Sequence, residues 1–258
     1  MAASFAWKVP VKPIKRWFCH DAEVSAPVRL FYFPYAGGNG AAILPWQADL
    51  GSSVELWVAQ LPGRGVRLFE ELPRNMDELV APLTEEVAGL ADRPFAFFGH
   101  SLGALVAFEV ARELRRQRLA GPTQLWASGA EGPQTRTIRR SLSGLPDAEL
   151  IEALRDYGAT PGEVLAEPEM MKLLLPGIRA DFWLNESYRY RPDSPLELPI
   201  LLLRGDADPI VDAERAAGWV RESSRPLREW VYPGDHFFIH PHRRAIAELV
   251  AAELTTQP

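Results

Sequence analysis

The stretch "FAFFGHSLGALVAFEVARELRR", residues 95–116, places a single serine between two glycines in a mainly apolar run. Its first four residues are typical of a buried strand, and residues 102–116 have the apolar spacing of an amphipathic helix. Residues Gly99 to Gly103 match G-x-S-x-G at the junction, which is where a nucleophile elbow must sit. The stretch therefore predicts a strand, a sharp turn that carries Ser101, and a helix.

A steric argument explains the glycines on either side of the serine. A sharp strand-to-helix turn strains the backbone of Ser101, and side chains at positions 99 and 103 would collide. The turn would direct the hydroxyl out of the sheet, where the amide of Leu102 and the helix dipole favour a developing oxyanion. We expect His100 to pack below the turn rather than to act as a base. The alternative is a tight turn with an incidental serine.

The rest of the chain alternates between strand and helix patterns. Strands are expected at 28–34, 54–62, 95–99, 123–130, 198–208 and 227–234, and helices at 75–90, 102–116, near 212–221 and at 243–254. Such alternation predicts a parallel sheet covered by helices on both faces. Residues 137–190 give only helical patterns. We therefore expect an N-terminal extension (1–27) and one domain (28–258) with a helical lid insertion at about 137–190.

A serine hydroxyl needs a base, and the expected chain order after the serine is an acid and then a histidine. His236 follows the last expected strand, and Asp206 and Asp208 follow the strand before it, at the sheet edge where α/β active sites form. We predict Ser101, Asp208 and His236 as the catalytic residues. Asp206 is the alternative acid, and it could instead orient the loop.

A second oxyanion donor is expected in the loop after the first strand. The segment "FPYAGGNG", residues 33–40, is made of small residues that let the backbone approach a carbonyl oxygen closely. We nominate the amide of Ala36 beside that of Leu102. A flexible glycine turn is the alternative interpretation of this segment.

Composition narrows the class of protein. The chain has 258 residues, 47% hydrophobic and 24% charged, which is ordinary for a globular domain. The net charge of −6 without a lysine-rich block argues against nucleic-acid binding. The single Cys19 excludes an intrachain disulfide. No apolar run approaches the about 20 residues that span a bilayer, and no secretory signal pattern is present. We expect a cytoplasmic protein without metal, cofactor or membrane contact.

Five segments together resemble the type II thioesterases, stand-alone α/β-hydrolases that accompany polyketide synthases and nonribosomal peptide synthetases. They are "FPYAGGNG", "LPGRGVR", "FFGHSLGALVAFEVA", "LRGDADPIV" and "GDHFFIHPH", in the order and spacing of that family. The likeness runs from about residue 28 to 253. "LPDAELIEALRDYGATP" and "DFWLNESYRY" look like the lid of that family.

The resemblance implies an α/β-hydrolase fold and hydrolysis of acyl thioesters on the phosphopantetheine arm of an acyl or peptidyl carrier protein, either to remove aberrant or stalled acyl groups or to release a product. Ser101 would be acylated, His236 would be the base, Asp208 would orient it, and Ala36 and Leu102 would hold the oxyanion. Asp235 departs from the family, which often has glycine before the histidine. Residues 1–27 lie outside the likeness. Trp7, Trp17 and Phe18 there either pack on the body or belong to a disordered tail.

Substrate and partner contacts are expected from the insertion and from basic residues. An apolar acyl channel would use Met171, Leu174, Phe182 and Trp183, with Met170, Leu173 and Leu175 as further candidates, although such spacing is also typical of core. Carrier proteins are typically acidic, so docking on this acidic chain needs a local basic patch. We nominate Arg64, Arg67, Arg136, Arg139 and Arg140, for which solvated surface charges are the alternative.

The triad alone does not identify the bond that is cleaved. A carboxylesterase or lipase would use the same residues, and an acyltransferase would pass the acyl group to an alcohol or amine instead of water. A non-catalytic hydrolase fold that acts as a binding protein is a third alternative, against which the complete Ser-Asp-His set argues.

Overall fold

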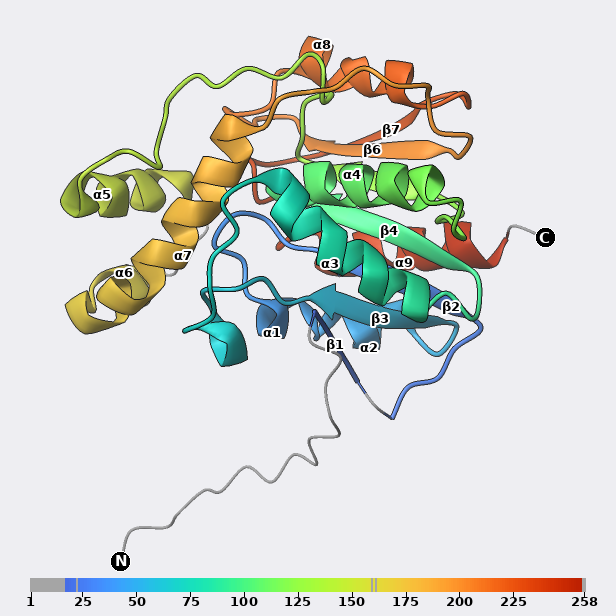
Figure 1. Ribbon diagram of the computed structural model, residues 1–258, viewed down its shortest axis with the longest axis horizontal. Coiled ribbons are helices and arrows are strands. Elements are labelled where there is room, and N and C mark those ends of the chain that lie inside the picture. The colour runs from blue at the N-terminus through green and yellow to red at the C-terminus, as the bar shows by residue number, and fades with distance from the viewer. Residues whose placement is uncertain (1–16, 22, 159, 161, 257–258) are drawn as a thin grey trace, which may run out of the picture.

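A seven-stranded sheet forms the centre of the molecule (Figure 1). The computed structural model describes residues 17–21, 23–158, 160 and 162–256. The strands are β1 (Phe18–His20), β2 (Val28–Phe33), β3 (Val54–Ala59), β4 (Phe95–His100), β5 (Leu125–Ser128), β6 (Ile200–Gly205) and β7 (Arg228–Tyr232). Their order is β1-β3-β2-β4-β5-β6-β7, and only β1 is antiparallel to its neighbour. The predicted, mostly parallel sheet is confirmed.

Helices cover both faces of this sheet. They are α1 (Gly40–Ile43), α2 (Trp46–Leu50), α3 (Met76–Gly89), α4 (Leu102–Arg116), α5 (Asp147–Tyr157), α6 (Gly162–Leu165), α7 (Pro168–Ser187), α8 (Ala213–Ala216) and α9 (Arg243–Thr255), with 3-10 turns at Gly65–Arg67 and Ala217–Glu222. Alternate strand residues point to opposite faces. Phe31, Phe33 and Phe97 pack with α3 and α4, and Tyr32 and Phe98 pack with α2 and α9.

The helical stretch between β5 and β6 contains α5, α6 and α7, which Figure 1 shows gathered beside the sheet rather than stacked on either face. The long α7 buries Met171, Leu175, Ile178 and Phe182, which lie at helical spacing on one side. The predicted helices of residues 137–190 are thus present, beginning at Asp147 after an irregular segment.

Three differences from the sequence predictions concern short elements. The edge strand β1 pairs Phe18 with Ala59 and lies inside the stretch expected to be an extension, so the sheet begins before residue 28. Phe18 is fully buried and Trp17 packs against the core, whereas Trp7 lies outside the described residues. Helices α1 and α2 were not predicted. The helix expected near 212–221 is a short α8 followed by a 3-10 turn, where Gly218 packs against the Thr135 side chain.

Candidate active site

The Ser101 turn joins β4 to α4 in a conformation that is rare for a residue with a side chain. Its φ is 55° and its ψ is −118°. A Cβ at Gly99 would lie 2.2 Å from the Gly103 carbonyl oxygen, and one at Gly103 would lie 1.9 Å from the Phe33 carbonyl oxygen. These distances confirm why both positions are glycine. They also show that the start of α4 presses against the end of β2.

His100 lies beneath this turn, fully buried, as its place in the sequence predicted. Its Nδ1 is 2.9 Å from the Ser128 hydroxyl, and its ring lies 5.1 Å from the His236 ring between centroids. Burial, and then the charges of His236 and His240, hold the pKa of His100 well below its ordinary value. His100 is therefore a neutral packing group under the nucleophile turn.

His236 and Asp208 form a buried pair at the ends of β7 and β6. The side chains are 2% and 1% exposed, and His236 Nδ1 lies 2.8 Å from Asp208 Oδ2. The other carboxylate oxygen accepts from the amides of Ile210 and Val211, at 2.8 and 3.1 Å. Burial by itself raises the pKa of Asp208, but the hydrogen bond and charge of His236 and these two amides bring it below its ordinary value. Asp208 is thus a carboxylate that fixes the ring of His236.

The alternative acid Asp206 and the neighbouring Asp235 bind backbone amides of the loops instead. Asp206 Oδ1 accepts from the Gly234 amide at 2.9 Å, which ties the β6 end to the loop after β7. Asp235 Oδ1 accepts from the Phe237 amide at 2.8 Å. Within the described residues, neither carboxylate is hydrogen-bonded to the His236 ring.

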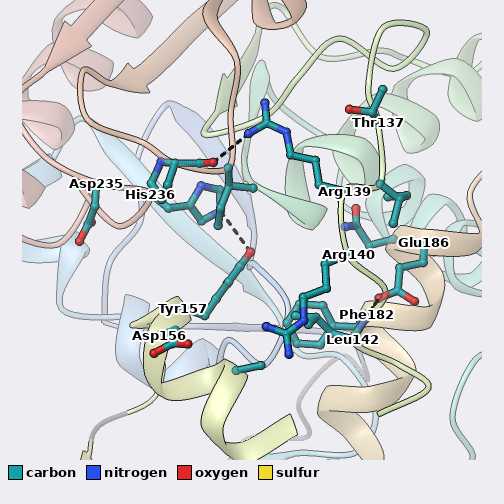
Figure 2. Close-up of a pocket in the computed structure, with 15 residues that line it drawn as sticks. Thr137, Arg139, Arg140, Leu142, Asp156, Tyr157, Phe182, Glu186, Asp235 and His236 are labelled. Atoms are coloured by element: carbon teal, nitrogen blue, oxygen red, sulfur yellow. Dashed lines mark hydrogen bonds between the residues drawn. The ribbon is translucent and has the colours of Figure 1, made fainter. Parts of the chain in front are cut away.

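Tyr157, the last residue of α5, was missed by the sequence analysis. Its hydroxyl oxygen lies 3.3 Å from His236 Nε2 and 3.5 Å from Ser101 Oγ. Figure 2 shows Tyr157 pointing at His236 from the helical segment. The only local signal was the Gly158 that follows, a left-handed helix end with a φ of 78°, and it gives no indication of where the phenol points.

The two nominated oxyanion amides belong to buried residues. Ala36 is 4% exposed and Leu102 is 1% exposed. Over the described part of the chain, neither amide makes a backbone hydrogen bond outside regular secondary structure. The next residue in the loop, Gly37, donates its amide to Asp181 Oδ2 on α7 at 2.7 Å. Helix α7 therefore holds the loop that presents the Ala36 amide.

Two cavities meet at His236. The outer one, ≈ 320 Å³ and drawn in Figure 2, is lined by Tyr157, Phe182 and Arg140 among others. The inner one, ≈ 70 Å³, is lined by Ser101 and Leu105. Both share Thr137, Ile138, Asn185, Ile210 and His236. The cavity lined by Tyr157 and the cavity lined by Ser101 therefore adjoin along these five residues.

Of the four predicted acyl-contacting residues, Phe182 alone lines either of these two cavities. Met171 is 1% exposed in the core, and Leu174 packs against that core. Trp183 is half exposed, and its indole donates to the Arg74 carbonyl at 2.9 Å. The helical spacing could not separate the face of α7 that packs from the face that meets the cavity.

The prediction that Arg64 and Arg67 dock a partner is wrong, because both are buried. Arg64 is 7% exposed and forms a two-pronged ion pair with Asp181, at 2.6 and 2.7 Å. Arg67 is 2% exposed, donates to the Gln60 carbonyl at 2.6 Å and stacks on Trp17. Their guanidinium groups hold loops together and are not available to a partner.

The remaining three arginines surround the cavities. Arg136 lines the inner one, stacks on Tyr188 and donates to Asn185 Oδ1 at 2.6 Å. Arg139 and Arg140 are exposed and line the outer one. Arg139 also donates to the Pro209 carbonyl at 3.0 Å. The outer cavity therefore carries two arginines beside the carboxylates of Asp156, Glu186 and Asp235.

Neither a cluster of metal-binding side chains nor a membrane-crossing helix is present in the described part of the chain. No group of three or more His, Cys, Asp or Glu side chains is placed to hold a metal ion. None of the helices there combines the length and apolar character needed to cross a bilayer. The expectations of no cofactor and of a cytoplasmic location stay predictions.

The doubly covered parallel sheet, with a serine at the β4–α4 turn, defines an α/β-hydrolase fold. The family model of the thioesterase domain matches residues 28–254. The chain therefore belongs to the thioesterase domain family and is a thioesterase.

Individual relatives indicate which kind of thioesterase this chain resembles. The gramicidin S biosynthesis protein GrsT of Aneurinibacillus migulanus is 36% identical over 95% of this chain and 96% of its own length. The type II thioesterase BorB from the borrelidin biosynthetic cluster superposes with a TM-score of 0.83 at 31% identity, covering 92% of this chain and 97% of BorB. The RedJ thioesterase from the prodiginine pathway of Streptomyces coelicolor superposes with a TM-score of 0.83 at 35% identity, covering 89% of this chain and 91% of RedJ. The resemblance to type II thioesterases of polyketide and nonribosomal peptide pathways is confirmed.

Proposed function

We propose that this thioesterase hydrolyses acyl groups from the phosphopantetheine arm of an acyl or peptidyl carrier protein, clearing aberrant or stalled acyl groups. The observation that carries the mechanism is the Asp208–His236 pair, whose Nε2 lies 3.3 Å from the Tyr157 hydroxyl, which in turn lies 3.5 Å from Ser101 Oγ. Relatives in polyketide and nonribosomal peptide pathways support the choice of substrate.

The chemistry proceeds in two halves. Ser101 Oγ attacks the thioester carbonyl while His236 Nε2 takes the hydroxyl proton, and the amides of Ala36 and Leu102 stabilise the oxyanion. The carbon–sulfur bond then breaks, and the thiol leaves with the proton from His236. Water, deprotonated by His236, attacks the acyl-enzyme, which releases the carboxylic acid and restores Ser101. Asp208 stabilises the imidazolium in both halves.

The helical segment α5–α7 acts as the lid in this proposal, because it supplies Tyr157 and Phe182 to the outer cavity. The exposed Arg139 and Arg140 at that cavity would attract the acidic surface of a carrier protein. Arg136, which is bonded to Asn185, would shape the inner cavity instead.

The test is loss of acyl mass from a phosphopantetheinylated carrier protein, followed by intact-protein mass spectrometry. Wild type is compared with Ser101→Ala, and the acyl N-acetylcysteamine thioester serves as the free substrate. We expect turnover in wild type only, with the carrier strongly preferred and the free carboxylic acid as product. Equal rates on the free thioester or on a simple ester would indicate a general esterase. An acylated amine or alcohol would indicate an acyltransferase, and an active Ser101→Ala would contradict the mechanism.

A further inference from the structure

The Tyr157 hydroxyl stands where the serine and histidine of the proposed triad should meet. It lies 3.5 Å from Ser101 Oγ and 3.3 Å from His236 Nε2, and the described residues contain no direct hydrogen bond between Ser101 and His236. Proton transfer from a serine requires the histidine within about 3 Å. The phenol therefore takes the place of the catalytic hydrogen bond in the free enzyme.

The protonation states give this contact a direction. Burial raises the pKa of Tyr157 to about 12, so the phenol keeps its proton at neutral pH. His236 Nδ1 faces the carboxylate of Asp208, which assigns the ring proton to Nδ1 and leaves Nε2 as an acceptor. Tyr157 consequently donates to His236 and accepts from Ser101. Both groups that should react with the substrate are engaged by one phenol.

The position of this oxygen matches that of a leaving group. During thioester cleavage, the departing sulfur must lie near both the serine oxygen and the histidine Nε2 that protonates it. Tyr157 lines the outer cavity and Ser101 lines the inner one, with His236 common to both. A thioester reaching Ser101 from the outer cavity therefore has to displace the Tyr157 hydroxyl.

The tyrosine is held in place by the helical segment. Its ring packs against Phe182 of α7 and Phe237, with centroids 5.7 and 5.4 Å apart. Gly158 ends α5 immediately after it, in a left-handed conformation. Movement of the α5 end would withdraw the phenol, and contacts made with the outside of that segment are the natural source of the required free energy.

We propose that Tyr157 is a specificity residue whose hydroxyl occupies the leaving-thiol position in the free enzyme, so that thioesters delivered by a carrier protein are favoured over small free esters and thioesters. The proposal rests on the function proposed above. A carrier contacts the helical segment while its phosphopantetheine arm enters, and these contacts offset the displacement of Tyr157. A small free substrate has only its own few contacts with which to displace it.

The experiment compares wild type, Tyr157→Phe and Tyr157→Ala. Labelling of Ser101 by a small fluorophosphonate reports access and nucleophilicity without a carrier, and kcat/KM is measured on the N-acetylcysteamine thioester and on the acyl carrier protein. Tyr188→Phe is the matched control, because Tyr188 follows α7, lines neither cavity and donates its hydroxyl to Glu109, while a phenylalanine ring keeps the packing on Arg136.

Tyr157→Phe should label about fivefold faster than wild type, which is the shift expected from losing one hydrogen bond. Its kcat/KM on the free thioester should rise similarly while the carrier value stays within about twofold. Tyr157→Ala should label faster still, and Tyr188→Phe should label like wild type. Unchanged labelling in both Tyr157 variants would overturn the proposal, and slower labelling would do so by showing that the phenol assists proton transfer. If wild type, Tyr157→Phe and Tyr157→Ala all fail to label at Ser101, Ser101 is not the nucleophile, and this inference fails with the proposed function.

Discussion

At the scale of single residues, Ser101 keeps a backbone conformation that its neighbours impose. Its φ of 55° is unfavourable for a residue with a side chain, and such strain persists only where the surroundings fix it. Here the fixing comes from close backbone packing, with Gly103 against Phe33 and Gly99 against Gly103. The strain and the packing together keep the hydroxyl at the sheet edge.

The variant Gly103→Ala should therefore be less stable than wild type. The new Cβ would lie 1.9 Å from the Phe33 carbonyl oxygen, and backbone at both places would have to move. We expect a loss of about 3 kcal/mol in the free energy of unfolding, measured by urea denaturation. Gly89→Ala, at the end of α3 with nothing within 4 Å of its Cβ, is the control and should change stability by no more than about 1 kcal/mol. Equal stability of the two variants would contradict the steric argument.

Asp208→Asn and Asp206→Asn separate the two candidate acids. An asparagine at 208 can still accept from the amides of Ile210 and Val211, but it turns an N–H toward His236 and so favours the tautomer that cannot take the serine proton. We expect kcat/KM to fall about a thousandfold or more. Asp206→Asn keeps an acceptor for the Gly234 amide, so its kcat/KM should stay within about threefold of wild type. Reversed results would make Asp206 the acid.

At the scale of elements, one ion pair fastens α7 to the loop that follows β2. Asp181 accepts from both Arg64 and the Gly37 amide, and Arg64 also donates to the Gly38 carbonyl at 3.3 Å. The two side chains are 8% and 3% exposed. The helical segment and the oxyanion loop thus share one buried anchor, which makes Arg64 and Asp181 positioning residues in the proposed mechanism.

Variants of this anchor should separate its effect on stability from its effect on catalysis. Asp181→Asn leaves the Arg64 charge buried and unpaired, and we expect a loss of about 3–5 kcal/mol in the free energy of unfolding. The double variant Arg64→Met, Asp181→Leu removes both buried charges of this anchor and should recover much of the lost free energy of unfolding. Its kcat should still be reduced about tenfold, because the Gly37 amide has lost its acceptor and the neighbouring Ala36 amide is less well placed. A double variant with the kcat of wild type would limit the anchor to a structural role.

At the scale of the whole molecule, the elements that the sequence could predict are those defined by local patterns. The six parallel strands and the long helices each carry enough residues to show a period, and the serine turn carries a motif. The strand β1 has three residues, and α1 and α2 have four and five, which is too few for a period.

Contacts between residues far apart in the sequence could not be predicted, for a different reason. Arg64 reads as a surface residue because its sequence neighbours are glycines, yet its partner lies 117 positions away. Tyr157 shows the same problem, since it ends a helix that a pattern can predict but reaches His236, 79 positions away, only through the packing of α5. The acid and the base could be predicted from the sequence, because parallel strands bring their carboxyl ends to one edge of the sheet.

The buried histidines give the folded molecule a predicted dependence on pH. Burial lowers the pKa of His100 well below 6.5 and also lowers that of His240, which bonds to the Tyr35 hydroxyl. The unfolded chain takes up protons at these two residues below about pH 6.5, whereas the folded chain does not. Their contribution to stability is therefore complete above that pH and is lost as the pH falls toward their folded pKa values.

Between pH 7 and pH 5, the free energy of unfolding should decrease, with a limiting slope of about 1.4 kcal/mol per pH unit from His100 and a smaller contribution from His240. Urea denaturation at a series of pH values measures this slope. Because glutamine does not titrate, His100→Gln and His240→Gln should each remove the contribution of that histidine to the slope. The double variant should remove both contributions. The lowered pKa of Asp208 has the same sign but acts only near its own titration, below the ordinary carboxylate range. A double variant with the same slope as wild type would show that other groups bind the protons and would contradict the neutral state of His100 beneath Ser101.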